Sequence, residues 1–512
     1  MAPSGITKHG RSGRVVPFDM SGVVRTDDDV LRYSTLATSL LDMFRSSVEH
    51  HPDRECVVVL DGERVTYRQM WDRCTRVAGG LRAAGVRHGD RVANRHRNGL
   101  EWCLGFWGTL MAGAVTVPVN TRFSQSEVDY VVTDAGATVV LEPDSPLPDG
   151  APHVTENADQ TTLAALMYTS GTTGFPKGAM VTHENFLSNS ETCRRVMNMP
   201  ADGDVRNLIS VPLFHATGCN SQLLPTIQLG GTAVIMPAFE PQAFLRAVVD
   251  EQIDVLTAAP AIFWLAMNQP NFSEFDMSRV NWVTYGGAPT APDVIARLGA
   301  SFPSALLANG FGLTETSSVS TCLPHEHAAT RPETVGFAAP PVELDLREPD
   351  PTGVGELLIR GQNIVAGYWN NPDKTAETFV DGWLHTGDLA RIDADGFVQI
   401  VDRLKDMICR GGENVYCVEV ENVLARHPQV FEVAVVGVPD EMMGEKVGAV
   451  VVPLPGSSPD PREIHAFVKE RIADYNAPQY VWIRNEPLPR NPAGKVVKPL
   501  LRNDARWSEE IR

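Results

Sequence analysis

The stretch Tyr168-Thr-Ser-Gly-Thr-Thr-Gly-Phe-Pro-Lys-Gly178 follows an apolar run over residues 163–167 and contains no acidic residue. Its glycines let backbone amides approach an anion closely, and its hydroxyl groups and lysine supply further donors and a positive charge. It is not a Walker A motif, because Lys177 is followed by Gly178 rather than by Ser or Thr. A flexible surface linker is the alternative, but a linker needs no lysine between Pro and Gly. The stretch therefore predicts a loop that holds phosphates.

Strands and helices alternate along the chain around this loop. Apolar spacing predicts helices over 39–50, 67–84, 100–112 and 183–199. Short apolar runs predict strands over 55–60, 91–93, 115–119, 232–236 and 280–285. From residue 353 onward short strands dominate. This order predicts an α/β fold whose large N-terminal domain has parallel-rich sheets covered by helices.

A charged segment, Asp402-Arg-Leu-Lys405, separates this region from a last one that has two predicted helices and two predicted strands. We therefore expect two domains, residues 1–401 and residues 402–512, of which the second is a small α+β domain. Residues 1–36 are mostly polar and are expected to be poorly ordered. Arg95-His96-Arg97 is interpreted as a solvated loop, with a basic patch for a phosphate-bearing ligand as the alternative.

Composition narrows the class of protein. The 512 residues are too many for one core, and a formal net charge of −19 makes nucleic acid an unexpected partner. The eight cysteines form no Cys-x-x-Cys pair, which favours a reducing, cytoplasmic location over a disulfide or zinc framework. Residues 1–14 have no apolar stretch after them, so no signal peptide is expected. The uncharged run 102–121 predicts a buried helix leading into a strand rather than a membrane span.

Further short motifs follow predicted strands. Gly286-Gly-Ala-Pro289 and Asn309-Gly-Phe-Gly-Leu-Thr-Glu-Thr316 lie where α/β sheets bind ligands. Trp383-Leu-His-Thr-Gly-Asp388, Arg410-Gly-Gly-Glu-Asn414 and Arg490-Asn-Pro-Ala-Gly-Lys495 come later. Together with the loop, these motifs resemble those of the adenylate-forming superfamily, which contains acyl-CoA synthetases, firefly-type luciferases and peptide-synthetase adenylation domains. The chain looks most like a bacterial fatty-acid or carboxylic-acid–CoA ligase.

The resemblance implies a two-step reaction that uses ATP, Mg²⁺ and CoA. A carboxylate first attacks the α-phosphate of ATP, which gives an acyl-adenylate and pyrophosphate, and a thiol then takes the acyl group. Because one anion attacks another, the first step needs positive charge, hydrogen-bond donors and a metal ion around the phosphates. The resemblance also implies a small β-barrel-like subdomain within the N-terminal adenylation core, and a C-terminal domain that rotates between the two steps.

The resemblance also implies which residues bind the nucleotide. They are Thr169, Ser170, Gly171, Thr172, Thr173, Gly174 and Lys177 in the phosphate loop; Gly287, Ala288, Pro289, Asn309, Gly310, Phe311 and Gly312 around adenine; Thr314 at the α-phosphate; Asp388 and Arg403 at the ribose; and Lys495. Phe311 stands where many relatives have Tyr, so ring stacking is kept and the hydroxyl is lost. Glu315 would bind Mg²⁺, because hard cations prefer carboxylate oxygens. The alternative for Glu315 is an exposed turn carboxylate.

Five residues complete the expected site. Lys495 would bridge the substrate carboxylate and the α-phosphate, with a solvated surface lysine as the alternative. His215, in Pro212-Leu-Phe-His215, would gate the acyl pocket, with a buried structural histidine as the alternative. Asp402 is the expected hinge. Gly411 and Gly412 would approach CoA, with an ordinary turn as the alternative. The expected catalytic residues are thus His215, Thr314, Glu315 and Lys495.

The charged residues that are absent from the pocket segments, and the short tail after Lys495, limit which acid and which acceptor are expected. Amino-acid-activating relatives have an Asp where His215 follows Phe214, and no Lys or Arg occurs in 211–220, 282–290 or 309–322. An uncharged fatty or aryl tail is therefore expected, without an amine or a second carboxylate. Only a short tail follows Lys495, so the acceptor is expected to be diffusible: CoA, or alternatively a separate acyl carrier protein. The oligomeric state stays open, with a homodimer as one option.

Two other classes of protein share these motifs. A luciferase-like monooxygenase would carry all of them, but the chain ends Glu-Glu-Ile-Arg512 without a Ser-Lys-Leu-type address. A non-catalytic binding protein would be expected to have lost Lys177, Glu315 or Lys495, and all three are present.

Overall fold

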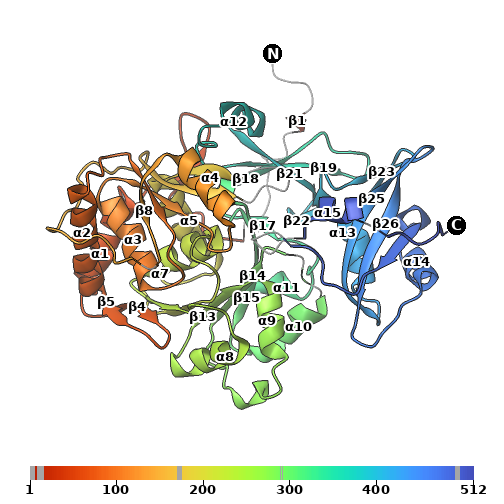
Figure 1. Ribbon diagram of the computed structural model, residues 1–512, viewed down its shortest axis with the longest axis horizontal. Helices are drawn as coiled ribbons and strands as arrows, with labels where there is room; N and C mark the ends of the chain where they lie inside the picture. The colour runs from red at the N-terminus through yellow and green to blue at the C-terminus, as the bar shows by residue number, and fades with distance from the viewer. Residues whose placement is uncertain are drawn as a thin grey trace.

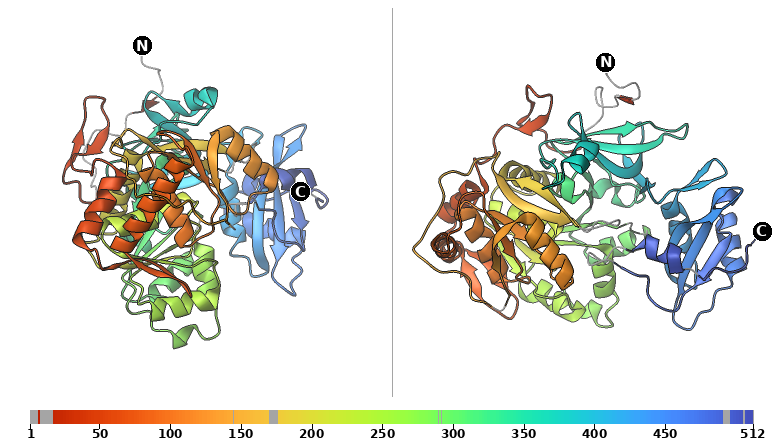
Figure 2. Two further views of the ribbon diagram at one scale, coloured as in Figure 1. Left: turned by 60° about the vertical axis from the view of Figure 1, so that its left-hand side comes forward. Right: turned by 45° about the horizontal axis from the view of Figure 1, so that its top comes forward.

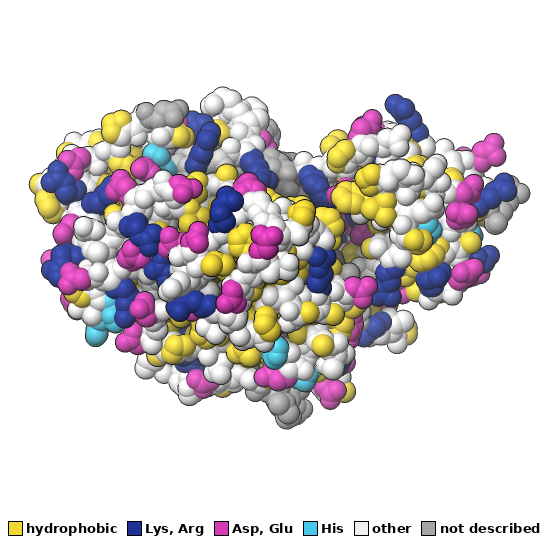
Figure 3. Space-filling model, turned by 90° about the horizontal axis from the view of Figure 1, so that it is seen from below, with side chains coloured by type: hydrophobic (Ala, Val, Ile, Leu, Met, Phe, Trp, Pro, Cys, Tyr) yellow, Lys and Arg dark blue, Asp and Glu magenta, His cyan; other side chains and the backbone are white. Residues whose placement is uncertain are grey.

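The computed structural model describes residues 6–7, 17–143, 145–169, 176–288, 290, 292–490, 496–504 and 506–511. Three sheets with flanking helices build a large N-terminal body, and a smaller C-terminal module lies to one side of it (Figure 1). The same separation is seen from two further directions (Figure 2). In the space-filling view a notch divides the two lobes (Figure 3). No helix among the described residues is both long and apolar enough to cross a membrane.

The largest sheet has nine strands in the order β17-β16-β15-β14-β13-β11-β12-β4-β5. They are β4 (Glu55–Val59), β5 (Arg64–Thr66), β11 (Arg206–Ile209), β12 (Thr232–Ile235), β13 (Val255–Ala258), β14 (Trp282–Gly286), β15 (Leu306–Phe311), β16 (Thr321–Leu323) and β17 (Phe337–Ala338). The six neighbouring strands β15, β14, β13, β11, β12 and β4 pair in parallel, as predicted for this region. Their carboxyl ends therefore meet along one edge of the sheet.

A second sheet has the order β10-β9-β7-β6-β8. Its strands are β6 (Arg91–Asn94), β7 (Val115–Pro118), β8 (Ala137–Leu141), β9 (Leu163–Thr169) and β10 (Lys177–Thr182). β9 and β10 are antiparallel, and Thr169 pairs with Lys177. The predicted phosphate loop is thus the connection of a hairpin, whose two ends the sheet holds opposite each other.

Helices cover both sheets. They are α1 (Leu40–His50), α2 (Tyr67–Ala83), α3 (Leu100–Met111), α4 (Gln125–Ala135), α5 (His183–Val196), α6 (Ala216–Gly218), α7 (Leu224–Gln228), α8 (Pro241–Asp250), α9 (Pro260–Met267), α10 (Pro292–Ser301) and α11 (His325–Ala328). α3 is buried almost all round and leads into β7, which confirms the prediction for residues 102–121. α5 ends earlier than predicted, because Asn198 adopts a left-handed φ of 50°.

The third sheet of the body is curved and mostly antiparallel. It contains β1 (Ile6–Thr7), β18 (Glu343–Arg347), β19 (Val354–Arg360), β20 (Phe379–Val380), β21 (Trp383–Ile392) and β22 (Val398–Arg403), and α12 (Pro372–Thr378) precedes β20. β22 pairs with β21, so that Asp388 lies opposite Arg403 and Leu389 lies opposite Asp402. The predicted β-rich region after residue 353 is confirmed.

The chain enters a separate sheet after β22. That sheet comprises β23 (Ile408–Arg410), β24 (Glu413–Val415), β25 (Val430–Asp440), β26 (Gly444–Pro453) and β27 (Tyr480–Ile483). The helices α13 (Cys417–Leu424), α14 (Pro461–Lys469) and α15 (Lys498–Asp504) belong to the same module, which has its own apolar core. The expected α/β body with a small α+β module at its C-terminal end is therefore confirmed.

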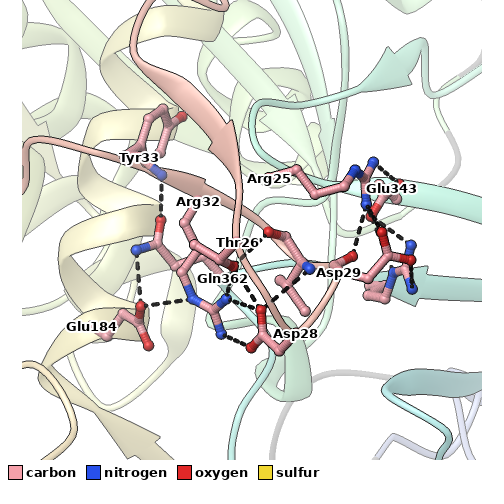
Figure 4. A network of polar contacts seen from close by, with 11 residues as sticks. Arg25, Thr26, Asp28, Asp29, Arg32, Tyr33, Glu184, Glu343 and Gln362 are labelled. Atoms are coloured by element: carbon pink, nitrogen blue, oxygen red, sulfur yellow. Dashed lines mark hydrogen bonds and ion pairs between the residues drawn. The ribbon is translucent and has the colours of Figure 1, made fainter.

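The expectation that residues 1–36 are poorly ordered is wrong for residues 17–36. β2 (Val23–Arg25) and β3 (Leu31–Tyr33) form a hairpin that is tied to the body by charged and polar side chains (Figure 4). Arg25 Nη2 lies 2.7 Å from Glu343 Oε1 of β18, and Arg32 Nε lies 3.3 Å from Glu184 Oε1 of α5. The polar residues that suggested disorder are thus paired, so the segment joins α5 to the curved sheet.

The loop at residues 95–97 is only partly the solvated loop that we predicted. Arg95 pairs with Glu142 across 2.6 Å, and Arg97 is exposed. His96 is instead 4% exposed, and burial lowers its pKa, which keeps the imidazole neutral.

His183, the first residue of α5, should make the fold sensitive to acid. It is 2% exposed, its Nδ1 accepts a hydrogen bond from the Leu40 amide at 3.2 Å, and burial lowers its pKa from 6.5 to about 4. Because the folded pKa is depressed, the contribution of His183 to stability is present above pH 6.5 and is lost as the pH falls toward 4. That loss amounts to about 3 kcal/mol.

We expect His183→Gln to be less acid-sensitive than the wild type when thermal unfolding is followed between pH 7 and about pH 4. The exposed His50 offers a matched control, since His50→Gln should keep the wild-type pH profile. Parallel pH profiles for His183→Gln and the wild type would contradict the role of His183.

Candidate active site

The predicted adenine-binding segments lie side by side at the carboxyl ends of β14 and β15. Gly286 pairs with Gly310, and a Cβ atom on Gly286 would overlap the Gly310 carbonyl, so the two strands approach more closely than a side chain would permit. Gly287 then turns with a φ of 76°, and Ala288 is exposed. Pro289 lies outside the described residues. Phe311 ends β15 half-buried, and the side-chain Nδ2 of Asn309 donates to the Thr334 carbonyl at 3.2 Å.

A tight turn after β15 positions the predicted metal-binding carboxylate. A Cβ on Gly312 would overlap the Ser318 carbonyl, so only glycine fits there. Thr314–Thr316 form a short 3-10 helix, and the Leu313 amide donates to Thr316 Oγ1 at 2.9 Å. Glu315 is thereby held beside Thr314 at the carboxyl end of β15.

Tyr368 links the two segments from which phosphate and metal contacts were expected. Its hydroxyl donates to Glu315 Oε1 at 2.7 Å, and Lys177 Nζ lies 5.2 Å from the centre of its ring. The backbone of Tyr368 bridges to Ala179 of β10, beside the phosphate-loop hairpin. The lysine of that hairpin therefore contacts the face of the Tyr368 ring, and the carboxylate after β15 contacts its hydroxyl.

Burial and neighbouring charges act on the pKa values in this cluster. Burial lowers the pKa of Lys177, and the nearby Lys374 lowers it further, whereas the Glu315 carboxylate acts in the opposite direction. Burial, together with the Glu315 charge, raises the pKa of Tyr368, so its hydroxyl stays protonated and donates. The cluster thus offers a cation, a hydroxyl donor and a carboxylate in one place.

The predicted ribose-binding pair lies on the curved sheet. Arg403 Nε is 2.6 Å from Asp388 Oδ1, and Asp388 is 2% exposed. The antiparallel register of β21 and β22 brings the two residues opposite each other although fifteen positions separate them in the sequence.

Asp402, the expected hinge, is buried where the body meets the C-terminal module. Its Oδ1 accepts from the Arg403 amide at 2.7 Å, and its Oδ2 accepts from the Cys417 amide at the start of α13. Burial raises the pKa of Asp402 to about 6, opposed by the charge of Lys498 and by these two amides. One carboxylate thus connects the last strand of the body to the first helix of the module.

His215 precedes a distorted helix at the edge of the site. It caps α6 half-buried, and its ring lies 4.8 Å from that of Phe214. The helix continues as a π-helix over Cys219–Leu223, a geometry that is frequent at functional sites. Ser221 in this segment donates to Ser318 Oγ at 2.6 Å, which ties the helix to the turn that carries Glu315.

A cavity extends from Gly310 along the face of the parallel sheet. The sheet forms one wall, and the end of α5 and the helix from Ser221 to Leu229 form the other. None of the described residues that line it carries a charge. An ionised group would lie there without a partner, whereas an apolar or weakly polar tail fits.

Two of the remaining predicted residues lie in the C-terminal module. Gly411 and Gly412 form the turn of the β23–β24 hairpin with φ values of 60° and 95°, and the Gly411 amide donates to the Met443 carbonyl at 2.7 Å. Lys495 lies outside the described residues, as do Ser170, Gly171, Thr172, Thr173 and Gly174. The residues beside Lys495 are fixed to the module, because Arg490 and Val496 bridge and Arg490 pairs with Glu432 at 2.7 Å.

The donors present suit a nucleotide with a hard divalent cation. Among the described side chains no group of three or more His, Cys, Asp and Glu residues is placed to hold a metal ion. Mg²⁺ commonly takes only one or two protein carboxylates and completes its shell with phosphate oxygens and water. The isolated carboxylate of Glu315 fits that mode.

Tyr368 was not among the residues predicted for the site. The chain carried a signal, since Gly367-Tyr368-Trp369 interrupts the β-rich region with a glycine and two aromatic residues. Only the fold shows that this segment lies against β10 and η3, the short helix that carries Glu315.

Comparison with known proteins agrees with this geometry. The family model of AMP-binding enzymes matches residues 44–369, and that of their C-terminal domain matches residues 419–495. A feruloyl-CoA synthase from Amycolatopsis is 38% identical over 85% of this chain and 93% of its own length. The fatty acid–[acyl-carrier-protein] ligase ScoC of Streptomyces coeruleorubidus is 33% identical over 94% of this chain and 99% of its own. The solved structure of a Mycobacterium tuberculosis fatty acyl CoA synthetase is 32% identical, covers 91% of this chain and 98% of its own, and superposes with a TM-score of 0.71.

Proposed function

The chain belongs to the family of AMP-binding enzymes, and we propose that it is an ATP-dependent acyl-CoA ligase for a carboxylic acid with an uncharged tail. The observation that carries the substrate class is the cavity whose described lining residues carry no charge. It begins at Gly310, in the same segment after β15 that carries Glu315. The acid would place its carboxylate at the cluster of Glu315, Tyr368 and Lys177 and its tail along the sheet.

In the first step the substrate carboxylate attacks the α-phosphate of ATP, and pyrophosphate leaves. Lys177, together with the hydroxyls and amides of residues 169–174, would neutralise the β- and γ-phosphates. Thr314 and Lys495 would donate to the α-phosphate, where negative charge concentrates in the transition state. Asp388 and Arg403 would bind the ribose. Gly287, Ala288 and Pro289 would form one adenine wall, and Asn309, Gly310, Phe311 and Gly312 the other.

Glu315 is the residue that would hold Mg²⁺. When bound, the ion supplies charge neutralisation at the phosphates. The Tyr368 hydroxyl, which donates to Oε1, would keep the carboxylate oriented for this role.

In the second step a thiol attacks the acyl carbon and AMP leaves. We place the division between the adenylation core, residues 1–401, and the mobile module, residues 402–512, at Asp402. This is supported by the position of Asp402 near the end of β22, the last strand of the curved sheet and of the body. Rotation there would bring Gly411 and Gly412 toward CoA, with His215 gating the acyl pocket. The two named relatives differ in acyl group and in acceptor, so an aryl acid and an acyl carrier protein are the alternatives.

Pyrophosphate release against a panel of carboxylic acids, with and without CoA, tests the proposal. We expect ATP-dependent release with uncharged alkanoic or aryl acids, little with dicarboxylic or amino acids, and an acyl-CoA product when CoA is added. Release without any CoA product would favour a carrier-protein acceptor. Oxygen uptake with light emission would favour a monooxygenase, and silence across the panel would favour a non-catalytic role.

A further inference from the structure

The sheet wall of the acyl cavity mixes polar and apolar side chains, and its helix wall is mostly apolar, with Ser221 and Thr226 as its polar members. The helix wall presents side chains such as Val196, Met197 and Leu229, whereas the sheet wall presents Asn207, Thr257 and Thr284. A pocket meant only for a hydrocarbon tail has no use for these polar groups, because leaving them unpaired costs free energy. The polar side chains of the sheet wall therefore indicate that the tail of the substrate carries a polar group.

The three polar residues lie on the same face of three neighbouring strands. Thr284 of β14 pairs with Thr257 of β13, and Asn207 of β11 pairs with Val255, two residues before Thr257. Gly310, next to the reacting end, pairs with Gly286, two residues beyond Thr284. With a rise of about 3.3 Å per residue, Asn207 lies about 13 Å below the level of Gly310, at the end of the cavity remote from the carboxylate.

Asn207 has an unused acceptor at that remote end. The residue is 4% exposed, and its Oδ1 has no hydrogen-bond partner among the described residues. Its Nδ2 donates to Thr226 Oγ1 at 3.0 Å, while the Thr226 hydroxyl donates to the Gln222 carbonyl at 2.7 Å. Because the Thr226 proton is committed to Gln222, Thr226 can only accept from Asn207, which fixes the amide with Oδ1 as the unpaired atom.

Nearer the reacting end, the hydroxyl of Thr284 has only a weak hydrogen-bond acceptor. Thr284 Oγ1 lies 3.2 Å from Met197 Sδ, and a thioether sulfur is a weak acceptor. Thr257 lines the cavity half-buried between Thr284 and Asn207. A ligand hydroxyl in the cavity thus meets hydrogen-bonding groups that no strong partner within the wall already occupies.

We propose that Asn207 selects acids that carry a hydroxyl group far from the carboxylate, with Thr257 assisting. This inference rests on the proposed ligase function and narrows its substrate class. The unpaired atom is an acceptor, so it distinguishes a hydroxyl, which donates, from a methoxy group, which only accepts. The tail itself would contact the apolar helix wall.

Adenylation of matched acids by the full-length enzyme tests the inference. The panel contains cinnamate with its para-hydroxy and para-methoxy derivatives, and decanoate with its omega-hydroxy and omega-methoxy derivatives. In the pair that fits the cavity, we expect kcat/KM for the hydroxy acid to exceed that of both partners by about tenfold or more, because discrimination by a buried hydrogen-bonding group is strong.

Near-isosteric variants assign the preference to the residue. Asn207→Leu and Thr257→Val should lower the hydroxy-to-unsubstituted ratio severalfold while keeping or raising kcat/KM for the unsubstituted acid. The control is Thr116→Val, which removes a fully buried hydroxyl that has no hydrogen-bond partner among the described residues and lies in β7, away from the cavity. It should leave the ratio unchanged.

Two failures can be told apart. Turnover of the unsubstituted or methoxy acids at least as fast as that of the hydroxy acids, or an unchanged ratio in Asn207→Leu, would overturn this inference alone. No turnover of any acid would overturn the proposed function. Thermal shifts with the acids alone would then still decide the inference. A hydroxy acid should stabilise the wild type more than its methoxy partner does, whereas the two acids should stabilise Asn207→Leu equally.

Discussion

Lys495→Ala is expected to lower the rate of pyrophosphate release by about 10²- to 10³-fold, because it removes a cation from the point where charge develops at the α-phosphate. Synthetic acyl-adenylate should still be converted to acyl-CoA at close to the wild-type rate, since the bond to pyrophosphate has already been broken in that substrate. A large loss in one half-reaction with little loss in the other is the expected signature of a residue that acts only in adenylation.

The structure explains why the effect should be confined to one half-reaction. The bridge between Arg490 and Val496 and the pair between Arg490 and Glu432 fix the ends of the segment that carries Lys495 to β25 of the C-terminal module. In the proposed mechanism the module would therefore carry Lys495 to the phosphates for adenylation and away from them for thioester formation.

The control for Lys495→Ala is Lys469→Ala, because Lys469 is an exposed lysine at the end of α14 in the same module. Lys469→Ala should leave both half-reactions unchanged. Equal losses of adenylation and thioester formation in Lys495→Ala would contradict the assignment and would indicate a folding defect or a role in both steps.

Local patterns predicted much of the fold. Four elements form where they were predicted: the helices at residues 39–50 and 67–84 and the strands at 115–119 and 232–236. Each could be predicted because the spacing of its own apolar residues shows which of its faces is buried. The N-terminal hairpin was missed because Arg25 and Arg32 are polar in sequence and acquire their partners, Glu343 and Glu184, only through the fold. Helix and strand propensities depend on neighbouring residues in the sequence, so they cannot predict ion pairs between residues that are far apart in it.

Residues of the site were likewise predicted only where they stand in a local sequence motif. Glycine turns at 286–289 and 309–316 indicated strand ends, because glycine is required where two backbones approach as Gly286 and Gly310 do. Tyr368 and Asn207 were missed, since neither stands in a motif. Tyr368 gains its meaning from contact with Glu315, and Asn207 from the register of β11 with β13 and from the hydrogen bond committed by Thr226.

Glu315→Gln tests the carboxylate in this arrangement. The substitution keeps the size of the side chain and an oxygen that can accept from Tyr368, but it removes the negative charge that a hard cation requires. We expect the rate of pyrophosphate release to fall by about 10²-fold or more, and the Mg²⁺ concentration that gives half-maximal rate to rise.

Tyr368→Phe is the matched variant, because it keeps the Glu315 charge and removes only the hydroxyl that donates to Oε1 at 2.7 Å. Losing one orienting hydrogen bond should cost about tenfold or less in rate. Saturating Mg²⁺ should restore more of the activity of Tyr368→Phe than of Glu315→Gln, because the first variant misorients the carboxylate whereas the second lacks its charge. If both variants lost the same rate and kept the wild-type dependence on Mg²⁺, Glu315 would be a structural acceptor for Tyr368 rather than a ligand of the metal.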